Sequence, residues 1–255
     1  MIVLPKNDDY PEFQINGIAF TEVPSKGIQY AVASVYGGPI KILSAVIQEP
    51  MTFLAGVLYA PLQKVLRHKI TVDNVPLNSG NELRLPASVI NKLNSAEERK
   101  KQKDRDDLTS ALEGDAYLAS WGCIKKPVNS KITSLFARPR TLPSGRSYYH
   151  SGVDLRARTG TPIKSALDGK VVYAGHMTVS GNNVILSHGG GLYSRYLHLS
   201  KLNVSEGERV PASEVVGLAG ATGRVEAPHL HWEMIWKGQY ASPLLLAEDW
   251  NQICL

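Results

Sequence analysis

The stretch His229-Leu230-His231-Trp232-Glu233, near the end of the 255-residue chain, decides the fold that the sequence predicts. Residues two apart on a β-strand point to the same face, so this stretch would present two imidazoles side by side and turn Leu230 away from them. The apolar residues that follow, as far as Trp236, favour a strand inside a sheet. Taken alone, a His-x-His pair is more often structural than metal-binding.

A second segment, upstream of the first, favours metal binding over a structural role for the two histidines. A catalytic zinc site takes three protein ligands and leaves a fourth position open, so two imidazoles need a further partner. The segment His150-Ser-Gly-Val-Asp154 supplies another imidazole and a carboxylate, and both segments lie in glycine-rich sequence. We therefore expect one metal site built from the two segments. The spacing alone does not decide between His229 and His231 as the ligand.

Further motifs accompany these two segments along the chain. They are His150-Ser-Gly-Val-Asp154-Leu, Gly160-Thr-Pro-Ile-Lys-Ser-Ala, Asp168-Gly-Lys-Val-Val, Val184-Ile-Leu-Ser-His188-Gly, Tyr196-Leu-His198-Leu-Ser, Gly220-Ala-Thr-Gly223 and Pro228-His-Leu-His231-Trp-Glu233. In this order and spacing, the stretch from about Lys131 to Pro243 resembles the catalytic domain of the LytM-type (lysostaphin-like) M23 metallopeptidases, which cut peptidoglycan peptides. The resemblance covers roughly half of the chain.

The resemblance implies a role for each site residue. His150, Asp154 and His231 would bind Zn²⁺, and a water molecule in the fourth position would attack the scissile carbonyl that the metal polarises. His198 and His229 match the positions that the family uses beside its metal, for proton transfer and for stabilising the transition state. An imidazole suits both tasks, because it accepts a proton when neutral and donates one when charged.

The implied function is that of a zinc-dependent endopeptidase that hydrolyses the peptide cross-links of bacterial peptidoglycan. Its partners would be stem peptides, and without a signature for glycine bridges we favour D,D-endopeptidase action on directly cross-linked peptides. Glycan cleavage would need a pair of flanking carboxylic acids, which do not accompany these motifs. The alternative is a catalytically silent or latent LytM-like module that binds or regulates cell-wall hydrolysis. The complete set of zinc ligands favours the enzyme.

The chain departs from the family pattern at two positions. Ala137 follows Phe136 where the family commonly has glycine, and Ala227 stands where the family has glycine before Pro-His-Leu-His. Alanine would be strained at either position if the backbone there needs a positive φ. Two other residues are expected to be structural: Glu233, by a salt bridge rather than by orienting a ligand, and His188, at the end of a strand.

The whole chain is expected to be mainly β, in three parts. Residues 1–93 predict a small N-terminal β-domain with strands in 27–36, 39–47, 52–59 and 65–72. Residues 94–126 predict a helical linker, which begins with a capping box at Ser95 and Glu98 and continues with charges of alternating sign. Residues 127–255 predict the LytM-type peptidase domain, an antiparallel sheet with longer loops at 138–149 and 201–209.

Composition sets the remaining expectations. The net charge of +5 and the pI of about 9.1 are compatible with an anionic cell wall, but no nucleic-acid-binding module is present. No apolar run is long enough to span a membrane. We expect a monomer in the periplasm or outside the cell, with its signal peptide absent from this sequence. Cys123 and Cys254 are either two buried thiols or one disulfide, and the sequence leaves both alternatives open.

Overall fold

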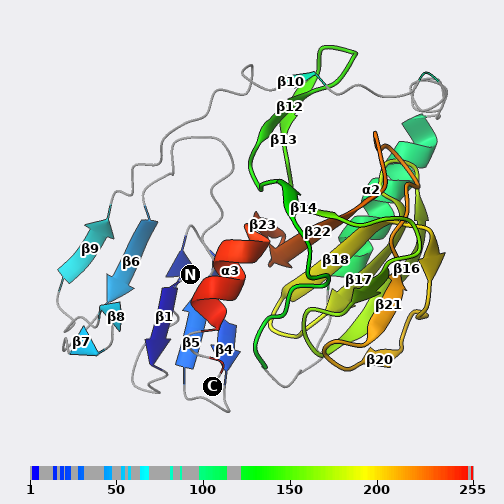
Figure 1. Ribbon diagram of the computed structural model, residues 1–255. Helices are drawn as coiled ribbons and strands as arrows, with labels where there is room; N and C mark the ends of the chain where they lie inside the picture. The colour runs from blue at the N-terminus through cyan, green and yellow to red at the C-terminus, as the bar shows by residue number, and fades with distance from the viewer. Residues whose placement is uncertain are drawn as a thin grey trace. The chain divides into compact units, whose positions relative to one another are not determined.

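The structure, a computed structural model, describes residues 98–113, 122–251 and 254, and outside them only short strands between residues 2 and 82 and residue 87. The chain divides into two compact units, residues 1–74 and residues 75–255. Figure 1 shows the strands of both units and the helices of the second. The predicted boundaries after residues 93 and 126 stay a prediction.

The first unit consists of short antiparallel strands. One three-stranded sheet has the order β1 (Ile2–Pro5), β5 (Ile28–Ala31), β4 (Thr21–Val23). Three antiparallel pairs join β2 (Gln14–Ile15) to β3 (Ile18–Ala19), β6 (Leu43–Ile47) to β9 (Lys64–His68) and β7 (Phe53–Leu54) to β8 (Val57–Leu58). Each of the four predicted strand regions overlaps a described strand, and the remainder of those regions lies outside the described residues.

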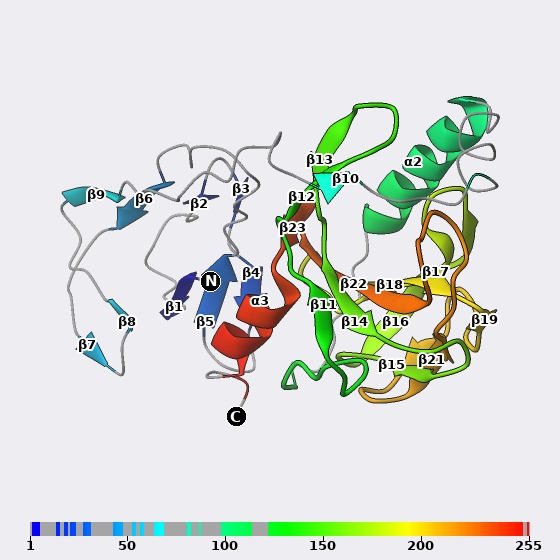
Figure 2. The same cartoon turned by 45° about the horizontal axis from the view of Figure 1, so that its top comes forward.

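The second unit is organised by an eight-stranded sheet, as predicted antiparallel between neighbours (Figure 2). Its order is β11 (Ile132–Ser134), β14 (Val153–Arg156), β22 (His229–Trp236), β18 (Leu192–Leu199), β17 (Gly181–Ser187), β16 (Gly169–Met177) and β20 (Arg209–Val210), with β23 (Gln239–Ala241) paired to β22. Strand β22 is the stretch that the alternation of its residues predicted. Leu230, Trp232 and Met234, on the face away from His231, have no exposed area, so the strand is buried on both sides.

Two smaller sheets correct the predicted loops. Residues 138–149 form the hairpin of β12 (Pro139–Thr141) and β13 (Ser147–Tyr149), and β12 also pairs with β10 (Asn81–Glu82). The tight turn at Gly145, with φ of 81°, returns the chain. In the second predicted loop, β19 (Lys201–Leu202) pairs with β21 (Val215–Leu218), which in turn pairs with β15 (Pro162–Lys164).

Helix α2 (Glu98–Leu112) corresponds to the predicted linker helix. Its first three turns carry mostly exposed charges, and its capping residue Ser95 lies outside the described residues. Its last turn packs on the sheet, where Ala111 joins a buried cluster with Ile185, Tyr193 and Ile235. The Tyr193 hydroxyl also donates a hydrogen bond to the Leu112 carbonyl. Among the described residues no helix is long and apolar enough to cross a bilayer.

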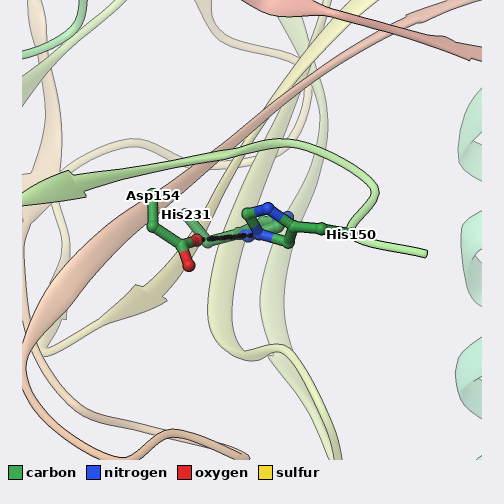
Figure 3. A group of neighbouring side chains, drawn as sticks. All are labelled: His150, Asp154 and His231. Carbon is green, nitrogen blue, oxygen red and sulfur yellow. Dashed lines mark hydrogen bonds and ion pairs between the residues drawn. The ribbon is translucent and has the colours of Figure 1, made fainter. Parts of the chain in front are cut away.

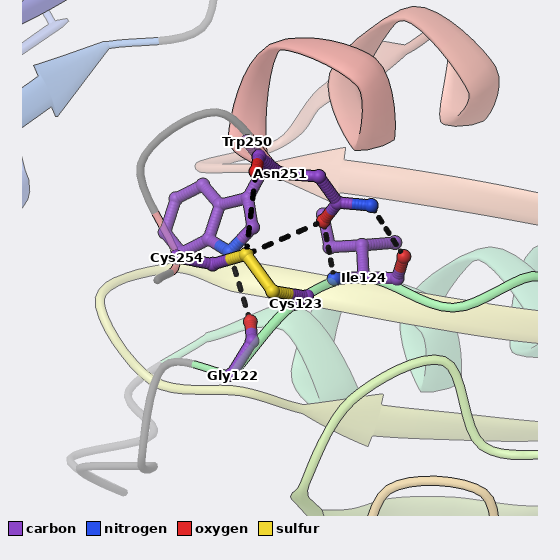
Figure 4. Close-up of a disulfide and its surroundings, with 6 residues drawn as sticks. All are labelled: Gly122, Cys123, Ile124, Trp250, Asn251 and Cys254. Atoms are coloured by element: carbon purple, nitrogen blue, oxygen red, sulfur yellow. Dashed lines mark hydrogen bonds between the residues drawn. A yellow bond between two sulfur atoms is a disulfide. The ribbon is translucent and has the colours of Figure 1, made fainter.

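The C-terminal helix α3 (Pro243–Trp250) was not predicted from the sequence. Ser242 caps it, Pro243 begins it, and the buried Trp250 donates a hydrogen bond to the Gly122 carbonyl. The helix leads directly to a disulfide between Cys123 and Cys254, whose Cα atoms are 5.1 Å apart (Figure 4). The disulfide alternative is therefore the one that the structure contains, and it fastens the end of the chain to the start of the sheet domain.

The backbone at Ala137 provides a direct test of the first departure from the family pattern. Ala137 has φ of 60°, whereas Ala227 is not among the described residues with positive φ. Because alanine in the left-handed region costs about 1–2 kcal/mol, Ala137→Gly should raise the free energy of unfolding by about 0.5–1 kcal/mol after the extra unfolded-state entropy of glycine is subtracted. Denaturant unfolding measures this change. Ala227→Gly is the matched control and should not stabilise; equal gains at both positions would contradict the strain argument.

Candidate metal and catalytic site

Antiparallel pairing of β14 with β22 builds the centre of the site. In this register Asp154 lies directly opposite His231, and His150 follows the hairpin β12–β13 just before β14 begins. The three side chains converge, and each offers one atom to a common centre (Figure 3). They are 2%, 6% and 6% exposed for His150, Asp154 and His231. The structure thus brings together the three residues that the sequence nominated as ligands.

The three inward-facing atoms are almost equidistant. His150 Nε2 lies 3.0 Å from Asp154 Oδ1 and 2.9 Å from His231 Nδ1, and His231 Nδ1 lies 2.8 Å from Asp154 Oδ1. Two imidazole nitrogens and one carboxylate oxygen form the donor set that zinc prefers.

Each outward-facing atom of this cluster has its own partner. His150 Nδ1 donates to the Leu135 carbonyl at 2.8 Å, and His231 Nε2 donates to Glu233 Oε1 at 3.0 Å. Because a carbonyl and a carboxylate can only accept, these contacts place the ring hydrogens on the outside and leave the inward lone pairs free in the neutral rings. Asp154 Oδ2 accepts from Arg140 Nη2 at 2.6 Å, which leaves Oδ1 facing the centre.

The electrostatics of the cluster favour a positive charge at its centre. Burial opposes ionisation of Asp154, but its close contacts with the His150 and His231 rings outweigh burial and lower the pKa of the carboxyl. Burial likewise opposes the charged form of His231, yet hydrogen bonds to Asp154 and Glu233 raise its pKa to about 9. Burial lowers the pKa of His150. Either a proton on His231 or a metal cation satisfies the three inward lone pairs.

His198 and His229 lie next to this cluster. The His198 ring is centred 5.1 Å from that of His229 and 6.0 Å from that of His231, and His229 Nε2 is 3.5 Å from Asp154 Oδ1. His198 Nδ1 donates to the Thr222 carbonyl and His229 Nδ1 to the Ala227 carbonyl, so both rings present Nε2 away from those contacts. Burial, followed by the charges of His229 and His231, lowers the pKa of His198 well below its usual value, which keeps this ring neutral.

Gly152 explains the glycine in the first ligand segment. A Cβ atom built there would overlap the Trp232 carbonyl oxygen and lie 2.9 Å from His231 Nε2. The backbone between His150 and Asp154 therefore passes too close to β22 for any side chain, and this close approach is what brings the two ligand segments together.

Sequence reasoning missed several residues that hold the cluster. Arg140 lies in the hairpin that was predicted to be a loop, and Ser151 donates to Glu233 Oε1. Glu233 does form the expected salt bridge, with Arg195 at 3.4 Å, but it also binds His231. Arg195 and Glu233 are the single charged residues of two apolar strands, and this pattern could have predicted the pair.

The expectation that His188 is structural agrees with its surroundings. Its ring is 1% exposed, and its Nδ1 donates to the Asp168 carbonyl at 2.7 Å. Its Nε2 lies 2.8 Å from the Ser194 hydroxyl, which lies 2.8 Å from the Tyr196 hydroxyl. Burial lowers the pKa of His188 to about 4, despite the opposing contact with Asp168.

Comparison with known proteins identifies a family that part of this domain matches. Residues 148–243 match the model of peptidase family M23. A peptidoglycan DD-endopeptidase, ShyA of Vibrio cholerae, is 42% identical over 116 residues, which cover 44% of this chain and 27% of ShyA. The DD-carboxypeptidase/endopeptidase Mpg of Neisseria meningitidis is 39% identical over 98 residues, which cover 38% of this chain and 23% of Mpg. The matched region thus spans about a quarter of these relatives.

One solved structure shares the fold over nearly the whole chain. A putative M23 peptidase from Pseudomonas aeruginosa superposes with a TM-score of 0.63 at 24% identity, over 96% of this chain and 91% of that one. The mainly β architecture and the resemblance to M23 peptidases are confirmed by these comparisons.

The buried His188 predicts a pH dependence of stability. Its folded-state pKa of about 4 is lower than the ordinary value of 6.5, so the unfolded chain binds more protons between these values. This difference in pKa contributes about 3 kcal/mol to the free energy of unfolding. The contribution of His188 is fully present above pH 6.5 and is lost as the pH falls towards 4. Denaturant unfolding across this range should show the loss in the wild type relative to His188→Gln. Parallel pH profiles for the two proteins would contradict the assignment.

Proposed function

We propose that this chain is a zinc-dependent endopeptidase that hydrolyses the peptide cross-links of bacterial peptidoglycan, on the premise that residues 148–243 match the model of peptidase family M23. The observation that carries the proposal is the convergence of three buried donor atoms, from His150, Asp154 and His231, whose outward-facing atoms are all engaged elsewhere. Relatives named as peptidoglycan DD-endopeptidases support the substrate and the location outside the cytoplasm.

The donor set fits a zinc ion in spacing. Bonds of about 2.0–2.1 Å in a tetrahedral arrangement separate two ligand atoms by roughly 3.3 Å. The three inward atoms are 2.8–3.0 Å apart, so each needs to move by only a few tenths of an ångström at most. The same three atoms carry lone pairs that repel one another unless a proton or a cation lies between them, so the cluster is suited to hold a cation.

Two further histidines would move protons beside the metal. A bound zinc ion supplies a Lewis acid that polarises a carbonyl group and lowers the pKa of water. His198 is kept neutral by its burial, so its Nε2 can accept a proton, while its Nδ1 stays fixed on the Thr222 carbonyl. His229 is fixed in the same way by the Ala227 carbonyl, and its Nε2 can accept a proton and return it to the leaving amine.

The site favours an amide over a glycosidic bond. Cleavage of a glycan needs a carboxylic acid that stays protonated near neutral pH, which requires a raised pKa. The pKa values of Asp154 and Glu233 are both lowered, because the hydrogen bonds and positive charges around each carboxylate outweigh the effect of burial. Each carboxylate is also paired with an arginine, so neither can act as that acid.

Zinc binding and catalysis should separate when the site residues are replaced one at a time. Purified protein should hold about one zinc per chain, and Asp154→Ala should lose it, because two imidazoles alone make a weak site. His198→Ala and His229→Ala should retain zinc but lose activity by about 10²- to 10⁴-fold, the usual effect of removing a proton-transfer residue. Elemental analysis and peptide hydrolysis measure the two properties. Full zinc retention by Asp154→Ala, or zinc loss by His229→Ala with retention by His231→Ala, would contradict the assigned roles.

The products from purified sacculi test the bond that is cut. D,D-endopeptidase action on direct cross-links should convert dimeric muropeptides into monomers while every disaccharide stays intact. Mass spectrometry of the digest reads this directly, with Asp154→Ala as the inactive control. Shortened glycan strands, or peptides released from the sugar, would show that a different bond is hydrolysed. Binding to sacculi without any product would favour the catalytically silent or latent module.

A further inference from the structure

Glu233 makes a contact with the proposed metal site that its salt bridge does not require. It follows His231 by two residues on β22, so both side chains point to the same face. Its Oε1 lies 3.0 Å from His231 Nε2, on the side of the ring opposite the site centre. The carboxylate is 2% exposed, and water therefore does not replace this contact.

The position of Glu233 is fixed by partners of its own. A buried carboxylate is costly unless it is paired and hydrogen-bonded. Arg195 lies directly across the sheet on β18, with Nη1 3.4 Å from Glu233 Oε2, and Ser151 donates to Oε1. Arg195 is in turn held by the Asn183 side chain at 3.0 Å and by the Ser180 hydroxyl at 2.7 Å. The carboxylate is thus held ionised at a defined place behind the His231 ring.

His231 differs in this respect from the other three histidines of the site. His150, His198 and His229 each donate to a main-chain carbonyl, of Leu135, Thr222 and Ala227. A side-chain substitution cannot remove those acceptors. For His231 the nearest acceptor, Glu233 Oε1 at 3.0 Å, belongs to a side chain that can be replaced, and the Ser151 hydroxyl lies farther from the same nitrogen, at 3.5 Å.

We infer that Glu233 is a positioning residue of the metal site, which holds the Nε2–H of His231 and thereby presents Nδ1 to the ion. The inference rests on the proposed function, since it assumes that His231 binds the metal. A carboxylate on the outer nitrogen of a metal-binding imidazole fixes its tautomer and its orientation and raises its basicity. Removal of such a partner typically weakens metal binding by about 10- to 100-fold.

Three variants of Glu233 separate positioning from charge. Glu233→Gln keeps the length of the side chain and an acceptor oxygen but removes the charge, and Glu233→Asp keeps the charge but is one methylene too short to reach His231. Glu233→Ala removes both. Positioning predicts that zinc affinity, measured by competition with a chromogenic chelator, falls by about 10- to 100-fold in the Ala and Asp variants and by much less in the Gln variant. Glu206→Gln, at a carboxylate that contacts the Ala174 amide, is the matched control and should leave the affinity unchanged.

The outcomes distinguish this inference from the proposed function. A wild-type chain without zinc affinity would overturn the metal site itself. Wild-type affinity in Glu233→Ala, with zinc bound by the wild type, would overturn only the role of Glu233. An Asp variant that binds zinc better than the Gln variant would show that the charge acts rather than the placed acceptor, and would also overturn the inference. If Glu233→Ala does not fold because Arg195 loses its partner, the zinc affinities of Glu233→Gln and Glu233→Asp still distinguish the placed acceptor from the charge.

Discussion

The pairing of β14 with β22 is the interaction on which the rest of the site depends. It sets Asp154 directly opposite His231, and a shift of register by one residue would send every side chain of one strand to the other face. The register is secured because β22 is buried on both sides, and its apolar residues would lose their packing in any other alignment. Gly152 adds to this, because only a residue without a side chain lets the two strands meet where the ligands converge.

The sequence predicted the central strand β22 well, because a strand follows from local pattern, whereas the ligand set stays a prediction that rests on the family resemblance. The alternation of histidines with apolar residues marks β22 from His229 to Trp236, and the two histidine segments indicate one centre. The hairpin at 138–149 was not predicted, because each of its strands is only three residues long and forms by pairing with the other. Helix α3 was not predicted, because Ser242 and Pro243 were not recognised as the start of a helix. Arg140 could not be assigned, since its contact with Asp154 depends on how that hairpin folds back.

Two strained backbone positions lie close to the site. Ala137 and His198 both have positive φ, at 60° and 64°, which residues with a Cβ atom rarely adopt. The Ala137 amide donates to the His150 carbonyl, and the His198 amide donates to the Ser180 carbonyl. At Ala137 this hydrogen bond is made to His150, a residue of the proposed metal site. At His198, itself a site residue, it is made to Ser180, whose hydroxyl accepts from Arg195. Such strain persists only where the surrounding structure fixes it, and it is common at functional sites.

The charges around the centre finally explain why a cation there would act on a substrate. Two carboxylates, of Asp154 and Glu233, are matched by two guanidinium groups, of Arg140 and Arg195. The protein groups therefore balance one another, and the positive charge of a bound zinc ion would remain largely uncompensated. That excess favours negative charge as it develops on a carbonyl oxygen at the site, in surroundings where burial strengthens the effect. Arginine pairing of both carboxylates thus keeps them available as hydrogen-bond acceptors without cancelling the charge on which catalysis would depend.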